Sequence, residues 1–276
     1  MNIDYSKIKG KKVLLFSGGM DCYTINELEK PDVLLYIDNH SKYSQVEKAF
    51  LKRMQKERNL YPNLVFVDDF INMSDIERDD YIIPARNAYF ILKAAEYGDE
   101  IILGATLGDR STDKDKLFAK QMTDLLNHIY EASHWIGEEA RHITVNFKYK
   151  DYTKQDLLKA LIEKRKKELG ISLSDAKALV AEKLVKETIS CYDFQDDENH
   201  ENKIPCGICK PCTRKWLAIL GATGWDMGKF FATNPRNYFT PKVIEQWIAK
   251  ESGPNNRGRE SQEIIEILEK LRDGKI

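Results

Sequence analysis

Short apolar runs alternate with longer amphipathic segments along the first half of the chain. Within each run the apolar positions are continuous rather than alternating, which favours strands buried on both faces. The runs cover residues 13–16, 33–38, 64–68, 101–105 and 143–147. Helical periodicity falls between them, over residues 44–59, 84–97 and 116–133. Strands that alternate with helices in this way predict an α/β fold with a doubly wound, parallel, five-stranded sheet.

The second half of the chain is predominantly helical in pattern. Amphipathic segments cover residues 152–169, 173–187 and 261–272, and no further strand is predicted after residue 147. We therefore expect an α/β domain over residues 1–150. A helical region follows over residues 151–276, with a cysteine cluster at 191–212 and a C-terminal extension.

Composition narrows the class of protein. The 276 residues include 42% hydrophobic and 32% charged residues, as in ordinary globular domains, and the formal net charge is -1. Because no basic excess is present, we expect no direct contact with nucleic acid. The apolar run near the N-terminus is too short for a signal peptide or a membrane span, so the sequence predicts a cytoplasmic protein.

The first apolar run leads directly into Ser17-Gly18-Gly19-Met20-Asp21-Cys22, and a helical segment follows. Glycines allow a sharp turn that brings backbone N–H groups close to an anion, and a helix N-terminus adds partial positive charge. Two glycines after a strand are also common in plain tight turns. The six residues together resemble the Ser-Gly-Gly-x-Asp-Ser loop of PP-loop enzymes, which bind the pyrophosphate of ATP. No Gly-Lys-Ser/Thr follows, so this is not a Walker A loop.

Candidate ligand contacts lie at the ends of the other predicted strands, where open parallel sheets bind ligands. Asp38 ends the second strand, and Gly104 ends the fourth. The segment Pro84-Ala85-Arg86-Asn87 begins a helix, with Pro84 at a position that tolerates its missing N–H. Arg86 and Asn87 are the candidate contacts there, although a salt-bridged surface arginine would give the same pattern. Asp113 lies in an acidic loop, where a carboxylate can accept hydrogen bonds from adjacent N–H donors of a ligand. A solvated charge run is the alternative for that loop.

Four of the five cysteines form one pattern. Cys191 precedes Cys206, Cys209 and Cys212, which are separated by two residues each. Four thiolates suit tetrahedral Zn²⁺, and tight Cys-x-x-Cys turns present two sulfurs to one ion. An iron–sulfur cluster is the alternative, but bacterial ferredoxins carry a further cysteine three residues later, and residues 213–216 supply none. The pattern favours a zinc site that stabilises a segment with little core of its own.

Taken in order, the loop at Ser17, the segment 84–87, Thr153-Lys154 and the four cysteines resemble the 7-cyano-7-deazaguanine synthase family of PP-loop ATP pyrophosphatases, including its variants in phage and bacterial defence. The resemblance covers residues 11–217. It implies ATP-dependent conversion of 7-carboxy-7-deazaguanine and ammonia to the nitrile, with AMP and pyrophosphate released. Mg²⁺ and Zn²⁺ are the implied metals, and we expect a homodimer.

The resemblance also assigns residues to roles. Ser17, Asp21 and Arg86 would be the catalytic residues. The nucleotide and substrate site would comprise Phe16, Ser17, Gly18, Gly19, Met20, Asp21, Cys22, Asp38, Arg86, Asn87, Gly104 and Asp113. The family usually has Ser or Thr at position 22, and the thiol of Cys22 is a weaker hydrogen-bond donor than a hydroxyl.

Two other functions remain open at the level of sequence. One is a related PP-loop ligase that stops at the amide or modifies a protein or tRNA acceptor. The other is a zinc-stabilised nucleotide-binding adaptor without catalysis, for which Cys22 in the loop is the direct support.

Overall fold

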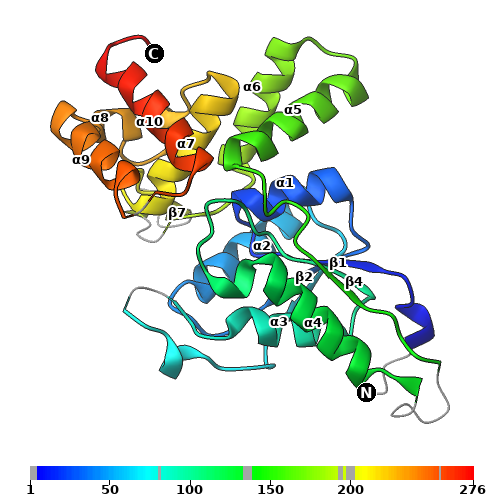
Figure 1. The fold of residues 1–276 in the computed structure, drawn as a ribbon. Coiled ribbons are helices and arrows are strands. Elements are labelled where there is room, and N and C mark those ends of the chain that lie inside the picture. The colour runs from blue at the N-terminus through cyan, green and yellow to red at the C-terminus, as the bar shows by residue number, and fades with distance from the viewer. Residues whose placement is uncertain (1–4, 80–81, 133–138, 192–194, 197–202, 255) are drawn as a thin grey trace. The chain divides into compact units, whose positions relative to one another are not determined.

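The structure is a computed structural model that describes residues 5–79, 82–132, 139–191, 195–196, 203–254 and 256–276 (Figure 1). The chain forms two compact units. Unit 1 comprises Met1–Ser17, Glu29–Ala105 and Asp109–Lys150, and unit 2 comprises Gly18–Leu28, Thr106–Gly108 and Asp151–Ile276. The division at residue 150 that the sequence suggested stays a prediction, because these units are defined by contacts and not by independent folding.

Unit 1 is built on a five-stranded sheet in which every neighbouring pair of strands is parallel. The strand order is β3-β2-β1-β4-β5, so the order reverses between β1 and β4, where open α/β sheets bind their ligands. The strands are β1 Lys12–Leu15, β2 Val33–Ile37, β3 Leu64–Val67, β4 Glu100–Ile102 and β5 Thr144–Asn146. All five overlap the predicted runs, and the predicted α/β class is confirmed.

The helices of unit 1 are α2 Ser44–Arg58, α3 Arg86–Ala94 and α4 Lys116–Ile129, with 3₁₀ turns η1 Tyr5–Lys7, η2 Ser74–Ile76 and η3 Thr112–Lys114. The sequence predicted that α3 begins at residue 84, but Ala85 has a left-handed φ of 59° and the helix begins after it. Asp115 caps α4 by accepting a bond from the Phe118 N–H at 2.7 Å. These helices cover a core in which Val13, Leu35 and Leu126 are almost fully buried.

Unit 2 is mainly helical. Its helices are α1 Met20–Glu29, α5 Lys154–Leu169, α6 Leu173–Lys186, α7 Lys210–Thr223, α8 Pro235–Tyr238, α9 Pro241–Ser252 and α10 Arg259–Arg272, with the 3₁₀ turn η5 Gly228–Phe230. A capping box between Thr153 and Asp156 begins α5, and Gly224, with a φ of 78°, ends α7. In Figure 1 the helices from α5 to α10 run from green to red, and α1 is blue.

Two features of unit 2 were not predicted from the sequence. Strands β6 Gln195–Asp196 and β7 Lys203–Ile204 pair antiparallel, so the expectation of no strand after residue 147 is wrong. Two residues per strand are too few to produce a periodic pattern. Helix α7 begins inside the cysteine cluster, at Lys210, where Pro211 occupies a position that tolerates its missing N–H.

The second core lies around α7. Trp216 is fully buried and its ring stacks on Phe239 at 5.8 Å between centroids. Side chains from α9 and α10, including Ile244 and Ile267, join the same core. The C-terminal extension is therefore part of the core of unit 2. None of the helices in the described ranges has both the length and the apolar character required to cross a membrane.

Candidate functional site

The phosphate-loop candidate connects β1 to α1. Gly18 has a φ of 77°, a conformation that favours glycine, and its carbonyl accepts a bond from the Ile189 N–H at 2.9 Å. The helix α1 begins at Met20, so its first free N–H groups follow the loop. The boundary between unit 1 and unit 2 lies within this loop, between Ser17 and Gly18. Phe16 and Met20 are buried, so only their backbone groups are available to a nucleotide.

Asp21 and Lys154 meet in unit 2. The Lys154 ammonium donates to Oδ2 of Asp21, and each side chain is about four-fifths buried. The other oxygen of Asp21, Oδ1, is buried and has no hydrogen-bond partner among the described residues. The resemblance included Thr153-Lys154 but gave Lys154 no role. The structure brings its charge to the loop because the capping box fixes the first turn of α5.

Asp38 lies at the carboxyl end of β2 in unit 1 and is fully buried. Its carboxylate accepts bonds from the His40 N–H at 2.9 Å and from Lys48 Nζ at 3.1 Å. Burial by itself raises the pKa of Asp38, but these bonds outweigh it and hold the pKa below its ordinary value. Asp38 therefore remains charged and shapes the turn that follows β2. The His40 side chain is exposed.

Arg86 and Asn87 begin α3. Asn87 is buried, and its amide Nδ2 donates to the Asp113 carbonyl at 3.3 Å. The structure therefore joins the Arg86 segment to the acidic loop, although they are far apart along the chain. The Asp113 carboxylate accepts a bond from the Ser111 hydroxyl. Gly104 follows β4 in the same unit, and the neighbouring Ala105 N–H donates to the Leu103 carbonyl at 2.9 Å.

Glu47 is a residue that sequence reasoning missed. Burial raises its pKa to about 7, opposed by the nearby Arg86 guanidinium and reinforced by the charge of Asp38. Arg86 Nε is itself buried without a hydrogen-bond partner in the described ranges. In the sequence, Glu47 resembled an ordinary acidic residue in the first turn of a helix, which carries no signal of burial.

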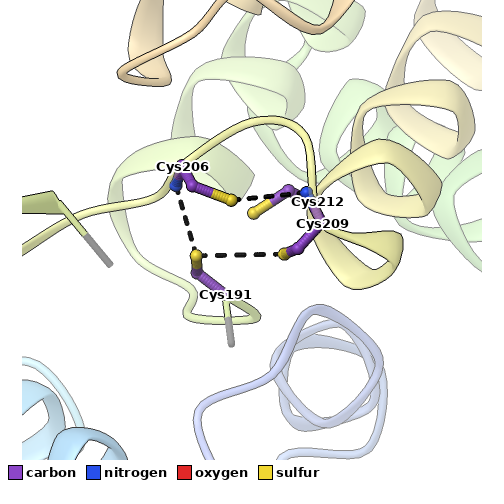
Figure 2. Close-up of side chains that lie close together, drawn as sticks. All are labelled: Cys191, Cys206, Cys209 and Cys212. Atoms are coloured by element: carbon purple, nitrogen blue, oxygen red, sulfur yellow. Dashed lines mark hydrogen bonds between the residues drawn. The ribbon is translucent and has the colours of Figure 1, made fainter. Parts of the chain in front are cut away.

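The four cysteines converge in unit 2 (Figure 2). Their Sγ atoms all lie within 4.8 Å of one another, and those of Cys191 and Cys209 are 3.9 Å apart. The Cys206 N–H donates to Cys191 Sγ at 3.2 Å, and the Cys209 N–H donates to Cys206 Sγ at 3.3 Å. Backbone donors of this kind stabilise thiolate charge.

The cluster fits a tetrahedral thiophilic metal. A Zn–S bond of about 2.3 Å gives S···S edges of about 3.8 Å, so only a small contraction is needed. Hydrogen bonds that the Cys212 thiol makes with Cys191 and Cys209, together with burial, raise the pKa of Cys212 far above its ordinary value. Four sulfurs this close cannot all carry charge without a cation. Of the five cysteines, only Cys22 lies outside this cluster.

The sequence-based description of the cysteine segment was incomplete. Three of the four cysteines belong to the large core around Trp216, so the segment does not lack a core. Gly207 has a φ of 86°, and a Cβ there would lie 1.9 Å from the Thr233 carbonyl oxygen. Lys215 is also buried, and its Nζ donates to the Thr188 carbonyl at 3.0 Å. Burial lowers the pKa of Lys215 to about 8, although Cys212 and Cys191 oppose the shift.

One comparison with known proteins gives a match. The family model described as "Queuosine biosynthesis protein QueC" matches residues 11–220. No curated protein and no solved structure matches the chain. The matched range contains the phosphate loop, Arg86 and the four cysteines, and it ends near the end of α7.

Proposed function

Because the chain belongs to the QueC family of queuosine biosynthesis proteins, we propose that it is an ATP-dependent ligase that converts 7-carboxy-7-deazaguanine and ammonia into 7-cyano-7-deazaguanine. The observation that carries this proposal is the pairing of Lys154 with Asp21 in the loop that follows β1. A lysine and a carboxylate at a helix N-terminus can bind a triphosphate and its Mg²⁺ ion. An ordinary tight turn has no need of this pair, so the pair favours a phosphate-binding loop.

We assign ATP binding to the loop and its neighbours. Backbone N–H groups of Gly18 and Gly19, with the Ser17 hydroxyl, would hold the pyrophosphate portion. Lys154 would exchange its bond with Asp21 for a phosphate oxygen. The unpartnered Oδ1 of Asp21 suits a Mg²⁺ ion, which would neutralise phosphate charge when bound.

We assign the deazaguanine to unit 1. Asp113 would accept N–H groups of the base, and Asn87 holds that loop through its backbone carbonyl. Arg86 would offset the negative charge of the substrate carboxylate or the α-phosphate. Asp38 follows β2 and Gly104 follows β4, the two strands that flank β1, so both lie at the carboxyl edge of the sheet, and we propose that they border the nucleoside.

The chemistry proceeds in two rounds. In the first, a carboxylate oxygen of the substrate attacks the α-phosphorus of ATP, and pyrophosphate leaves. Ammonia then attacks the acyl carbon, the bond from that carbon to the AMP oxygen breaks, and one proton passes to solvent. In the second round the amide oxygen attacks the α-phosphorus of a second ATP, and pyrophosphate leaves. Loss of AMP and two protons then leaves the nitrile.

In this proposal the protein acts by position and charge and forms no covalent intermediate. The four-cysteine cluster would hold Zn²⁺ as a structural ion with no open coordination position, which stabilises the start of α7.

We further propose that the chain works as a homodimer in the cytoplasm. The native mass, measured by light scattering, tests the dimer, since one chain has a mass of 32.0 kDa.

A second candidate is a ligase of the same class that stops at the amide or transfers it to a protein or tRNA acceptor. Residues 221–276 support this candidate, because they form part of the core of unit 2 but lie beyond the range matched by the family model. An adaptor without catalysis would bind ATP and leave it intact.

One experiment separates these functions. The protein is incubated with ATP, 7-carboxy-7-deazaguanine and ammonium, and the products are analysed by mass spectrometry. We expect AMP, pyrophosphate and the nitrile, and no product from Asp21→Asn or Lys154→Gln. Asp273→Asn, on an exposed carboxylate near the C-terminus, is the matched control. Release of ADP and phosphate would refute the mechanism, and an amide alone would select the second candidate.

A further inference from the structure

A segment of five consecutive residues, 187–191, contacts both the phosphate loop and the four-cysteine cluster. It follows α6, which ends at Lys186, and its last residue, Cys191, belongs to the cluster. The segment forms no helix or strand, although Thr188, Ile189 and Cys191 are all buried. The path of its backbone therefore depends on hydrogen bonds to other elements.

Two contacts join the segment to the phosphate loop and to α1, the helix that follows the loop. The Ile189 N–H donates to the Gly18 carbonyl at 2.9 Å. The Tyr23 hydroxyl of α1 donates to Glu187 Oε2, also at 2.9 Å. All four residues belong to unit 2. Residues 187 and 189 therefore hold the segment against the loop and the first turns of α1.

Two further contacts join the same segment to the cysteine cluster. Cys191 supplies one of the four sulfurs, and this sulfur accepts a bond from the Cys206 N–H at 3.2 Å. Lys215 lies one turn of α7 after Cys212, and its Nζ donates to the Thr188 carbonyl at 3.0 Å. Lys215 is only 3% exposed. Burial of an ammonium is costly without a hydrogen bond, so this contact constrains the segment strongly.

The contact at Gly18 bears on phosphate binding through the geometry of one peptide group. The carbonyl of Gly18 and the N–H of Gly19 belong to the same planar trans peptide and point in opposite directions. A bond that holds this carbonyl therefore also directs the Gly19 N–H, one of the donors that we assign to the pyrophosphate of ATP. Gly18 has a φ of 77°, and a glycine without such a bond samples many other conformations.

We propose that the metal-loaded cysteine cluster positions the phosphate loop through residues 187–191, with Lys215 as a positioning residue. Cys191, held in the cluster, fixes one end of the segment, and Lys215 fixes its middle at Thr188. The Ile189 N–H then keeps the Gly18 carbonyl in the orientation that favours phosphate binding. The cluster thereby raises the affinity for ATP in addition to stabilising the fold. That ATP binds at this loop rests on the proposed function, and the identity of the acceptor does not enter.

Binding of ATP to the zinc-loaded protein tests Lys215 without reference to turnover. The dissociation constant for ATP with Mg²⁺ is measured by isothermal titration calorimetry. Lys215→Met removes the ammonium and keeps an unbranched side chain. We expect this variant to hold one zinc per chain and to bind ATP about fivefold or more weakly. Lys270→Met, on an exposed lysine of α10, is the matched control and should bind ATP as the wild type does.

The same variant separates positioning from a purely structural role. If Lys215 only stabilises the fold, Lys215→Met lowers the unfolding temperature, but the folded, zinc-loaded variant binds ATP as tightly as the wild type. That result would overturn the proposal. In turnover we expect the KM for ATP to rise in Lys215→Met, while the KM for ammonium stays unchanged.

A measurement on the wild type does not depend on the folding of any variant. Co²⁺ replaces Zn²⁺ in the cluster, because both ions accept tetrahedral thiolate ligands and bound Co²⁺ absorbs visible light. Addition of ATP with excess Mg²⁺ should shift this absorption, since the segment connects Gly18 with Cys191. Adenosine, which lacks phosphates, should leave the spectrum unchanged.

The coupling between the two sites must also be reciprocal. If the bound metal tightens ATP binding, ATP tightens metal binding by the same factor, which chelator competition with and without ATP measures. Equal metal affinity under both conditions, with an unchanged Co²⁺ spectrum, would overturn the proposal while ATP binding stands. Absence of ATP binding in the wild type would overturn the ATP assignment and the proposal together. Coupling without formation of amide or nitrile would refute only the proposed acceptor.

Discussion

Cys22 is the one residue of the phosphate loop that departs from the pattern of related PP-loop enzymes. It lies in the first turn of α1, where a helix N-terminus lowers the pKa of a thiol, so it resembles a nucleophile. Adenylation requires no enzyme nucleophile, however, and a thiolate beside a triphosphate is electrostatically unfavourable. We expect Cys22→Ser to retain or exceed wild-type turnover, because a hydroxyl is a better donor to phosphate.

The measurement for Cys22 is ATP consumption together with alkylation. A bulky thiol reagent should block the wild type, ATP should protect it, and Cys22→Ser should resist the reagent. Loss of turnover in a folded, metal-loaded Cys22→Ser protein would contradict the mechanism. A trapped thioester on Cys22 would replace it with acyl transfer through the thiol.

Glu47 gives a pH-dependent prediction. Its folded-state pKa of about 7 exceeds the ordinary value of 4.5, so protonation stabilises the folded state. That contribution is fully present below pH 4.5 and is lost as the pH rises through about 7. Glu47→Gln removes the titrating group. As the pH rises from 4.5 to above 7, the free energy of unfolding of the wild type should therefore fall by about 1 to 3 kcal/mol relative to that of Glu47→Gln.

Urea unfolding of both proteins, near pH 5 and near pH 8, checks this prediction, because other titrating groups are common to the two proteins. A constant difference between wild type and Glu47→Gln at the two pH values would show that Glu47 does not titrate in this range.

The residues that the sequence could and could not identify differ in a physical way. The phosphate loop and the cysteines were visible because glycines and thiols at fixed spacing are rare outside such sites. Lys154, Glu47 and Lys215 were not assigned a role, because a charged residue in a helix is ordinary until its burial and partners are known. The structure supplies those partners in Asp21, Arg86 and the Thr188 carbonyl.

At the scale of elements, the loop that holds Cys206 and Cys209 depends on one glycine. Gly207 combines a φ of 86° with a distance of 1.9 Å from a built Cβ to the Thr233 oxygen. Backbone bonds from Ala232 and Thr233 to Pro205 and Cys206 hold the two segments together. Alanine at position 207 must therefore separate them or distort the cysteine turn.

We expect Gly207→Ala to lower the zinc content and the unfolding temperature together. Gly170→Ala is the matched control, because Gly170 also has a positive φ, of 63°, but a Cβ there meets nothing within 4 Å. That control should cost roughly 1 to 2 kcal/mol from backbone strain alone and keep its metal. Metal analysis and thermal unfolding measure both effects. Equal behaviour of the two variants would refute the role of the contact with Thr233.

Element prediction succeeded where periodicity was long and failed where local chemistry decided. The five parallel strands have buried apolar runs, so their existence followed from the pattern. The start of α3 could not be predicted from the pattern, because Ala85 adopts a left-handed conformation that no residue propensity indicates. The hairpin β6–β7 consists of two-residue strands, which are too short to show a period.

At the scale of the whole molecule, residues that follow the range matched by the family model supply part of the core of unit 2. Helix α7 spans Lys210–Thr223, and the match ends at residue 220. The apolar face of α7, with Trp216, Leu217 and Leu220, packs against Phe239, Ile244, Ile264, Ile267 and Leu268 of the extension. Arg214, on the same helix, has its two buried carboxylate partners, Glu251 and Glu260, in the extension.

Deletion of residues 225–276 should therefore prevent unit 2 from folding. Each of the five apolar side chains removed contributes about 1.5 to 3 kcal/mol by burial, so the sum approaches the whole stability of a typical domain. The deletion also leaves Arg214 without its carboxylates, which adds the cost of an unpaired charge. We expect an aggregating protein with little bound zinc. A chain that lacks only residues 273–276 should resemble the wild type, since it keeps α9 and α10. Zinc content, circular dichroism and light scattering compare the two. A monodisperse, zinc-loaded deletion protein would show that α7 does not need the extension as a partner.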